Sequence, residues 1–389
     1  MIIQPKVKGF ICTTAHPDGC AEYVKRQIET TKACGPMNGP KKVLVIGSST
    51  GYGLASRITV SFGCGADTLG IMFEKPATAR RTATPGFYNT QAFEKAAAAE
   101  GLYAKTINGD AFSEEIKAQT IETIKKDLGQ IDCIIYSLAA PRRTAPDGIT
   151  YTSALKTTQG SFTEKSWVLK DNTIETATIG PATEEEITGT RKVMGGEDWI
   201  LWIRALYEAG VVAEHALTIA YSYIGPQLTY PVYHEGTIGL AKKHLYDSCT
   251  ALNQEFADKG LTARISVNKA LVTQASSAIP IVPLYFALLY RVMKDHGLHE
   301  GCIEQMNRLF KDKLPAKDAA LDEEGQIRLD DWEMKPEIQE EVMKRWEKVN
   351  SSNLLELADV EGYWEDFYHM FGFHFDNVDY DRDIDLEAQ

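Results

Sequence analysis

The chain has 389 residues, 44% hydrophobic and 24% charged, a composition that is ordinary for a globular protein and excludes the disordered and fibrous classes. Its 54 acidic and 41 basic residues give a formal net charge of −13, and no basic run offsets it, which argues against a general nucleic-acid binder. Anionic ligands must therefore be bound by local features of the fold.

The cysteines and the apolar segments indicate a cytoplasmic protein. The seven cysteines form no C-x-x-C pair and are odd in number, which favours reduced thiols. The N-terminus has no charged region followed by an apolar core, so no signal peptide is expected. The longest apolar run, residues 279–290, contains two prolines and is too short to span a bilayer, so no integral membrane contact is expected.

Residues 1–40 form a preface that a nucleotide-binding fold does not need. A strand-like stretch over residues 2–12 predicts an N-terminal hairpin, a turn is expected around residues 16–19, and a helix continues to about Thr31. We expect this preface to pack over the site or against the sheet.

Residues 41–54 are the stretch around which the rest of the chain is organised. Residues 43–46 form the short β-branched run of a strand that is covered on both faces. Gly47, Gly51 and Gly53 then permit a tight turn, in which backbone N–H groups can approach a pyrophosphate at the start of the next helix. The G-x3-G-x-G spacing resembles the short-chain dehydrogenase version of the dinucleotide fingerprint. A glycine-rich connection without a ligand is the alternative.

A second apolar run, residues 67–73, ends at Glu74, about 20 residues beyond the last glycine. In dinucleotide folds an acid at this point holds the adenosine ribose hydroxyls. A carboxylate there would repel a 2′-phosphate, so the pattern favours NADH over NADPH. The alternative is a solvated strand end.

Strand and helix patterns then alternate at the spacing of βαβ units. Helices are expected over residues 89–100 and 113–128, the latter with Ser113 as its N-cap, and strands over residues 102–107 and 131–137. The alternation predicts an α/β fold with a Rossmann-type, doubly wound parallel sheet. Two groups follow strands at the carboxyl edge where such sheets bind ligands, namely Asp110 with Ala111, and Leu138 with Ala139.

The second half of the chain resumes the core after an insertion. Residues 142–186 are rich in polar residues and predict a flap of short strands with a hairpin over residues 167–175. An amphipathic helix over 198–210, a strand over 217–221, a helix over 240–256 and a strand over 263–267 follow. Residues 269–273 leave that last strand, again at a carboxyl end.

The C-terminal part is predicted to be helical and polar, with an acidic tail that increases solubility. His296 and His299 lie three positions apart, but Gly297 separates them and no carboxylate cluster accompanies them, so we expect no metal site.

Tyr233 and Lys242 form the pair to which we assign chemistry. A lysine ammonium can hold the ribose of a nicotinamide cofactor, and its charge favours the phenolate, so the tyrosine can donate to developing oxyanion charge. Ordinary short-chain dehydrogenases place this pair at i and i+4. Here the offset is nine positions, about 900° of helical rotation and half a turn out of phase. Gly236 and Gly239 offer a break, so we expect Tyr233 in a loop and Lys242 on the next helix. A loop aromatic and a surface lysine without a function are the alternative.

With this Tyr-x8-Lys arrangement the whole chain resembles the FabV-type enoyl-acyl-carrier-protein (ACP) reductases and the related trans-2-enoyl-CoA reductases. The matching segments are residues 47–53, 73–74, 109–112, 136–140, 193–199, 221–225, 271–273 and 329–332. The resemblance implies Tyr233 as proton donor, Lys242 as a ligand of NADH and Tyr223 as a substrate contact. The implied cofactor-binding residues are Gly47, Ser48, Ser49, Thr50, Gly51, Tyr52, Phe73, Glu74, Asp110, Ala111, Leu138, Ala139, Lys242, Leu271, Val272 and Thr273.

The resemblance implies NADH-dependent reduction of the C2=C3 double bond of trans-2-enoyl thioesters, in fatty acid synthesis or reductive formation of short-chain acids, by a monomer without a metal. Because the sequence has no internal repeats or low-complexity linkers, we expect one domain over residues 1–389, with a preface (1–40), a dinucleotide-binding core (41–142), a flap (143–195), a catalytic half of the core (196–275), and substrate-covering helices with a C-terminal extension (276–389). Within this last region, residues 276–290 are expected to wall the acyl pocket, although a buried core helix would have the same apolar pattern.

Three alternatives remain open from the sequence. A carbonyl-reducing short-chain dehydrogenase would use the same tyrosine and lysine, normally with a serine at the carbonyl. A non-catalytic NADH sensor would need only the glycine turn and Glu74. The carrier is either CoA or an acyl-carrier protein, and residues 267–273 look more like those of the CoA-reducing members.

Overall fold

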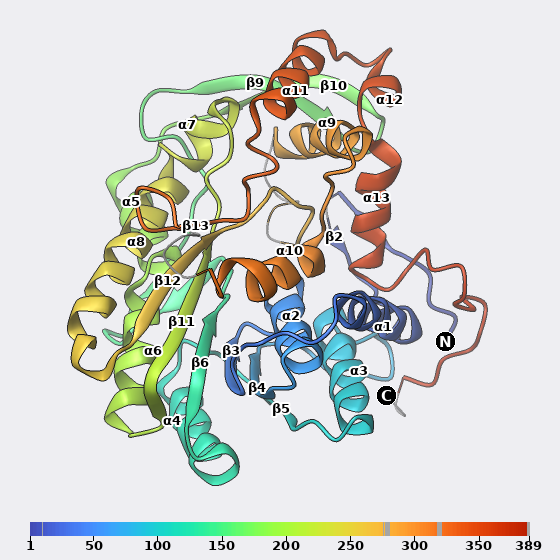
Figure 1. Ribbon diagram of the computed structural model, residues 1–389. Coiled ribbons are helices and arrows are strands. Elements are labelled where there is room, and N and C mark those ends of the chain that lie inside the picture. The colour runs from blue at the N-terminus through green and yellow to red at the C-terminus, as the bar shows by residue number, and fades with distance from the viewer. Residues whose placement is uncertain (10, 275, 277–280, 317–320, 387–389) are drawn as a thin grey trace.

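A parallel seven-stranded sheet forms the centre of the computed structural model, which describes residues 1–9, 11–274, 276, 281–316 and 321–386 (Figure 1). In spatial order its strands are β13 (Ile327–Arg328), β12 (Thr262–Val267), β11 (Val212–Ser222), β6 (Ile131–Tyr136), β3 (Lys42–Ile46), β4 (Asp67–Met72) and β5 (Ala104–Asn108). The chain moves outward from β3 to β5, returns to β6 and then continues to the other edge. This reversal beside β3 confirms the predicted doubly wound Rossmann fold.

Helices cover both faces of the sheet, and alternate residues of β3 face opposite layers. Leu44 and Ile46 pack with Trp199 and Leu245 in one buried cluster, whereas Val43 belongs to the cluster on the other face. The first layer holds α4 (Glu114–Thr123), α6 (Glu197–Glu208) and α8 (Thr237–Glu255), and the second holds α1 (Pro17–Ala33), α2 (Gly51–Ile58), α3 (Pro85–Ala99) and α10 (Cys302–Arg308). A strand buried on both faces is what the continuous apolar run predicts.

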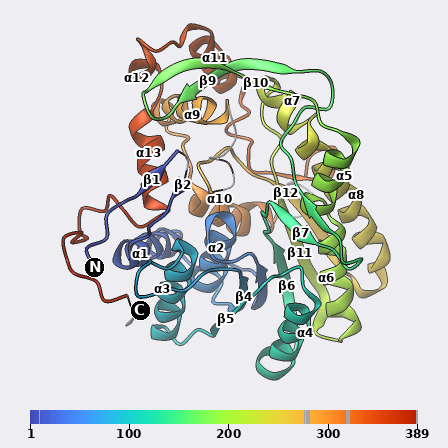
Figure 2. The ribbon, with the colours of Figure 1, turned by 180° about the vertical axis from the view of Figure 1, so that it is seen from behind.

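A third apolar cluster lies beyond the carboxyl edge of the sheet. Figures 1 and 2 both show α9 (Val282–Asp295), α11 (Pro336–Lys348), α12 (Leu354–Leu357) and α13 (Val360–His369) there, with the long hairpin of β9 (Phe162–Val168) and β10 (Thr173–Ile179) across them. Leu284 of α9, Trp346 of α11, Phe367 of α13 and Trp167 of β9 share this cluster. The C-terminal helices and the inserted hairpin therefore form one roof over the sheet edge.

Several expectations are confirmed and others need correction. The hairpin at residues 167–175 is present, and the Ser113 hydroxyl accepts a hydrogen bond from the Ile116 amide as the N-cap of α4. The expected turn at residues 16–19 is instead the first turn of α1, where His16 is the N-cap and Nδ1 accepts from the Gly19 amide. A histidine before proline resembles a turn, but Pro17 at the first helical position suits a helix start.

Helical structure departs from the expected pattern in further places. The flap region holds β7 (Arg142–Thr144), β8 (Thr150–Thr152) and a helix, α5 (Glu184–Met194), which the polar composition had concealed. Three α-helices end in π-helical turns, at Thr59–Gly63, Ile124–Leu128 and Leu309–Lys313. Short 3₁₀ turns lie at Gln227–Thr229 and Ala257–Lys259. Local propensity does not distinguish such turns from α-helix.

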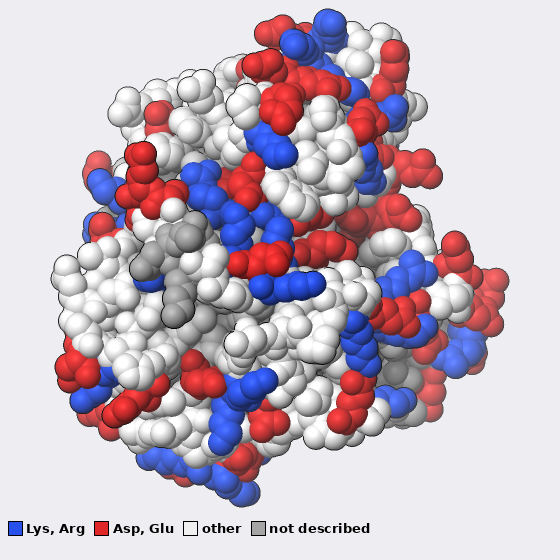
Figure 3. All heavy atoms as spheres, viewed as in Figure 1, with Lys and Arg blue, Asp and Glu red and all other residues white. Residues whose placement is uncertain are grey.

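The N-terminus and the last described residues of the chain lie beside one another. The short strands β1 (Val7–Lys8) and β2 (Ile11–Cys12) pair antiparallel, and the Ile384 amide donates to the Met1 carbonyl oxygen at 3.0 Å. Acidic and basic side chains are interspersed over the face shown in Figure 3. No helix among the described residues has the length and apolar character needed to cross a membrane.

Candidate active site

A cavity of about 620 Å³ opens at the carboxyl ends of the sheet strands, beneath the roof. It brings together residues that are far apart in the chain. Its lining includes Gly47, Ser49, Thr50, Gly51, Tyr52, Phe73, Glu74, Asp110, Ala111, Leu138, Ala139, Tyr223, Tyr233, Lys242, Leu271, Val272 and Thr273. Ser48 is also proposed from the sequence but does not line the cavity. It is fully buried behind the turn, and its hydroxyl donates to the Ile71 carbonyl oxygen.

The glycine turn packs backbone directly against backbone. Gly47 has a φ of +85°, and a Cβ there would lie 2.3 Å from the Ser137 carbonyl oxygen. A Cβ on Gly53 would lie 1.8 Å from the Gly47 carbonyl oxygen, so neither position accepts a side chain. Helix α2 begins at Gly51 without a side-chain cap or an acidic residue in its first turn. Its positive end is therefore available to a pyrophosphate, and the cradle fits a dinucleotide.

Glu74 stands at the end of β4, on the side of the cavity expected for the adenosine ribose. Its Oε1 accepts a hydrogen bond from the Ser49 hydroxyl at 2.6 Å. The Asn108 side chain bonds both the amide and the carbonyl of Glu74 at 2.9 Å, which fixes the backbone. Phe73 beside it is 77% exposed and lies at the cavity rim. A large apolar ring left this exposed is suited to covering a bound base.

The loop after β5 supplies Asp110 and Ala111. The Asp110 carboxylate accepts from the Phe112 amide at 3.0 Å, and the Ala111 carbonyl accepts from the Trp202 indole at 3.1 Å. The loop is therefore held by its own turn and by a buried tryptophan of α6.

Tyr233 is the last residue of the short helix α7 (Tyr230–Tyr233), which corrects the expectation that it lies in a loop. Burial raises the pKa of its phenol, and the charge of Glu333 adds to the effect. The phenol thus remains protonated at neutral pH, ready to donate. The expected bias toward the phenolate is absent from the free protein because desolvation disfavours the charged form.

Lys242 lies on α8, as predicted, and Gly236 provides the break as the N-cap of that helix. Gly239 is inside α8, where a Cβ would lie 1.9 Å from the His234 carbonyl oxygen, so this glycine lets α7 and α8 approach closely. The Lys242 ammonium donates to the Tyr221 carbonyl oxygen at 3.1 Å, and burial lowers its pKa to about 8. Because an ammonium has several N–H donors, Lys242 can hydrogen-bond a ligand in addition to the Tyr221 carbonyl oxygen.

Tyr223 follows β11 and meets Tyr233 edge to face, with ring centroids 4.8 Å apart. Its hydroxyl donates to Glu333 Oε1 at 3.3 Å. Sequence analysis missed Glu333, although it directly follows the matching segment 329–332, because an acid in a polar helical region suggests solvent exposure.

The loop 271–273, which the resemblance assigns to the cofactor, is fixed by hydrogen bonds to residues that follow it in the chain. The Val272 amide donates to the Tyr290 hydroxyl at 3.0 Å, and the Ser276 hydroxyl donates to the Leu271 carbonyl oxygen at 2.8 Å. Within the expected acyl wall, Ser276 and Phe286 line the cavity, whereas Ala287 is buried and its carbonyl accepts from the Asp359 amide. Residues 277–280 of that wall lie outside the described residues.

The two histidines considered for a metal face different neighbours. His296 contacts Glu341 at 3.2 Å, and His299 packs against the Tyr290 ring at 4.4 Å. Among the described residues, no group of three or more metal-ligating side chains forms.

A dinucleotide cradle on a doubly wound sheet, beside a tyrosine and a lysine, defines a nicotinamide-dependent oxidoreductase of the short-chain-dehydrogenase-like fold. Comparison with known proteins is more specific. The model of the trans-2-enoyl-CoA reductase catalytic region matches residues 81–315, and that of the NAD(P)H binding domain of trans-2-enoyl-CoA reductase matches residues 2–79. The chain belongs to the trans-2-enoyl-CoA reductase family.

Relatives match over their whole length. The trans-2-enoyl-CoA reductase [NADH] of Ruminiclostridium cellulolyticum is 52% identical over 100% of this chain and 98% of its own. The enoyl-[acyl-carrier-protein] reductase [NADH] of Saccharophagus degradans is 55% identical over 99% of this chain and 98% of its own. The structure of Clostridium acetobutulicum trans-2-enoyl-CoA reductase in complex with NADH is 44% identical, covers 100% of this chain and 98% of its own, and has a TM-score of 0.97. The chain is an enoyl reductase that uses NADH.

A third model, described as an enoyl reductase FAD binding domain, matches residues 321–384. Of the described residues in this region, only Met370 lines the cavity. Its helices instead bury their apolar faces around α9 in the roof. The region does not fit a flavin.

Proposed function

We propose that the chain reduces the C2=C3 double bond of trans-2-enoyl-CoA thioesters such as crotonyl-CoA, with Tyr233 as proton donor. The observation that carries this proposal is the edge-to-face pair of Tyr223 and Tyr233 at the cavity, next to Lys242 and the loop 271–273. The phenol of Tyr233, which the Tyr223 ring packs against, is suited to donate to an oxygen that becomes negative during the reaction.

When bound, NADH supplies the hydride that adds to the β-carbon of the enoyl group. The charge then moves to the thioester oxygen, where the hydroxyl of Tyr233 donates a hydrogen bond, while Tyr223, whose own O–H donates to Glu333, packs against the Tyr233 ring. Because burial keeps the phenol of Tyr233 protonated, it can act as an acid and not only as a dipole. Lys242 holds the nicotinamide ribose, the turn at Gly47 holds the pyrophosphate, and Glu74 accepts from the adenosine ribose hydroxyls.

The choice of CoA as the carrier is supported by residues 267–273, and the alternative is an enoyl-ACP reductase of type II fatty acid synthesis. Relatives with either name match the whole chain at similar identity. We further propose that the protein is a monomer and that it lies in the cytoplasm; the seven free cysteines, all of which lie in the described residues, support the second of these proposals.

Steady-state kinetics with purified protein tests these proposals. NADH oxidation with crotonyl-CoA is expected, and a higher kcat/KM with the CoA thioester than with the acyl-carrier-protein thioester of equal chain length supports CoA. The reverse order would assign the chain to fatty acid synthesis. Turnover of a ketone panel without crotonyl-CoA turnover, or no turnover at all, would contradict the enoyl reductase assignment. Light scattering after size exclusion reports the oligomeric state.

A further inference from the structure

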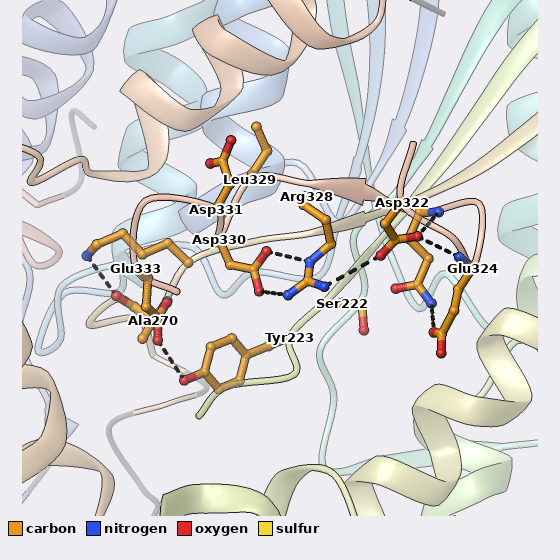
Figure 4. A network of polar contacts seen from close by, with 12 residues as sticks. Ser222, Tyr223, Ala270, Asp322, Glu324, Arg328, Leu329, Asp330, Asp331 and Glu333 are labelled. Carbon is orange, nitrogen blue, oxygen red and sulfur yellow. Dashed lines mark hydrogen bonds and ion pairs between the residues drawn. The ribbon is translucent and has the colours of Figure 1, made fainter. Parts of the chain in front are cut away.

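Glu333 is a fully buried carboxylate that joins two functional parts of the site (Figure 4). Its Oε1 accepts hydrogen bonds from the hydroxyls of Tyr223 at 3.3 Å and Tyr285 at 2.7 Å. Its Oε2 accepts from the amide of Ala270 at 2.7 Å. Tyr223 belongs to the proposed substrate side, whereas Ala270 directly precedes the cofactor loop 271–273. One side chain therefore touches both.

Glu333 has a buried cation and three hydrogen-bond donors around it. Burial raises the pKa of its carboxyl, and the charge of Lys269, which is also buried, opposes this shift together with the hydrogen bonds from Ala270 and Tyr285. The Lys269 ammonium donates to the Ala270 carbonyl oxygen at 3.0 Å and lies 4.8 Å from the centre of the Tyr290 ring. A buried carboxylate without such partners is strongly destabilising, so this arrangement is a specific one.

The hydrogen bond from Tyr223 also sets the geometry of the tyrosine pair. Tyr223 is held at one end by the strand β11 and at its hydroxyl by Glu333, and its ring packs edge to face on Tyr233. Without an acceptor at Glu333, nothing in the described contacts would fix the hydroxyl at this place. A displacement of about 1 Å in such a group lowers rates by roughly 100-fold.

We propose that Glu333 is a positioning residue, which fixes Tyr223 against Tyr233 and anchors the cofactor loop at Ala270. This inference rests on the proposed function, because it acts through Tyr223 as a substrate contact. The region that follows residue 321 then has a role in the reaction that does not involve a flavin. It supplies the hydrogen-bond acceptor that aligns Tyr223 in the catalytic half of the chain.

The test is a double-mutant cycle with Glu333→Leu and Tyr223→Phe. Leucine has a similar size but no acceptor atom, so the hydroxyl of Tyr223 and the amide of Ala270 both lose their acceptor. At saturating NADH, Glu333→Leu is expected to lower kcat for crotonyl-CoA by about 10- to 100-fold in the wild-type background. In the Tyr223→Phe background the same change should lower kcat by less than about threefold, because the hydroxyl that it positions is gone.

The anchoring of the loop 271–273 at Ala270 is tested by a separate measurement. Fluorescence titration with NADH alone should show a dissociation constant raised severalfold by Glu333→Leu in both backgrounds, because the contact to Ala270 does not involve Tyr223. Asp330→Asn is the matched control: it removes another fully buried carboxylate of the same segment, paired with Arg328, and should lower thermal stability while kcat stays within about twofold.

If the substitution lowers kcat by the same factor in both backgrounds, Glu333 does not position Tyr223. If it leaves the NADH affinity unchanged, Glu333 does not anchor the loop. If Glu333→Leu does not fold, Glu333→Asp keeps the charge but shortens the side chain and must give the same pattern. If wild-type protein does not oxidise NADH with any enoyl thioester, the proposed function fails, while the NADH titration still tests the anchor at Ala270.

Discussion

Replacing Tyr233 by phenylalanine removes one oxygen that faces the cavity. Among the described residues this hydroxyl has no hydrogen-bond partner, and the ring keeps its edge-to-face contact with Tyr223. The free energy of unfolding should therefore change by less than about 1 kcal/mol. If the phenol donates a proton in the reaction, kcat should fall by about 10²- to 10⁴-fold, which corresponds to about 2.7–5.4 kcal/mol of transition-state stabilisation.

The assay follows NADH absorbance with crotonyl-CoA, together with NADH titration and thermal melting of the same preparation. NADH affinity should stay within about twofold, because the lost group acts in the transition state. Tyr230→Phe is the control, since Tyr230 lies on the same short helix but stacks on His234 outside the cavity. A Tyr233→Phe enzyme that retains more than about a tenth of wild-type kcat would refute the role of proton donor.

Four further outcomes are expected. Glu74→Ser should raise NADPH use relative to NADH, and a wild-type enzyme that already prefers NADPH would contradict the role of this carboxylate. Gly47→Ala should abolish NADH binding in titration while Gly65→Ala, in open space, should not, because only the first Cβ meets a carbonyl oxygen. Phe286→Leu should raise kcat/KM for trans-2-hexenoyl-CoA relative to crotonyl-CoA by up to about tenfold, since each extra buried CH₂ contributes about 0.8 kcal/mol; a constant ratio would assign Phe286 to the core. Because the pKa of Lys242 is lowered to about 8, its ammonium is lost as pH rises through that value, so NADH affinity should decline above about pH 8. Lys242→Met should weaken NADH binding and remove this pH dependence, and an unchanged titration in that variant would place the lysine outside the site.

The features that sequence analysis predicted correctly are those set by neighbours in the chain. Residues 43–46 predict a buried strand, because β-branched residues favour the extended conformation. Gly47 and Gly51 predict the tight turn after it, because only glycine adopts this positive φ without strain. The separation of Tyr233 from Lys242 also requires a helix break, whichever fold surrounds it. The break lies at Gly236, as expected, whereas one helical turn at α7 was too short to have a periodic signal.

Other features are decided by long-range packing. The strand β13 has two residues and pairs with β12 only because the chain returns there after α10, so no local pattern predicts it. Residues 282–290 of α9 are all apolar or aromatic in the sequence, yet Phe286 lines the cavity, whereas Ala287 is buried and its carbonyl accepts from the Asp359 amide. Which side of such a buried stretch borders a cavity depends on what packs around it.

The sequence by itself determined the dinucleotide turn, the doubly wound order of strands and helices, and the tyrosine and lysine with their unusual spacing, because each depends on residue type and spacing over a short stretch. Only the tertiary structure decided the partners of these residues. Glu333 is an ordinary acid among polar residues in the sequence, and it becomes a buried acceptor for Tyr223 and Ala270 because the chain brings together segments 110 and 63 residues apart. The environment of a charge, and hence its pKa and its role, is a property of the packed structure, since burial and hydrogen bonds to distant segments set it.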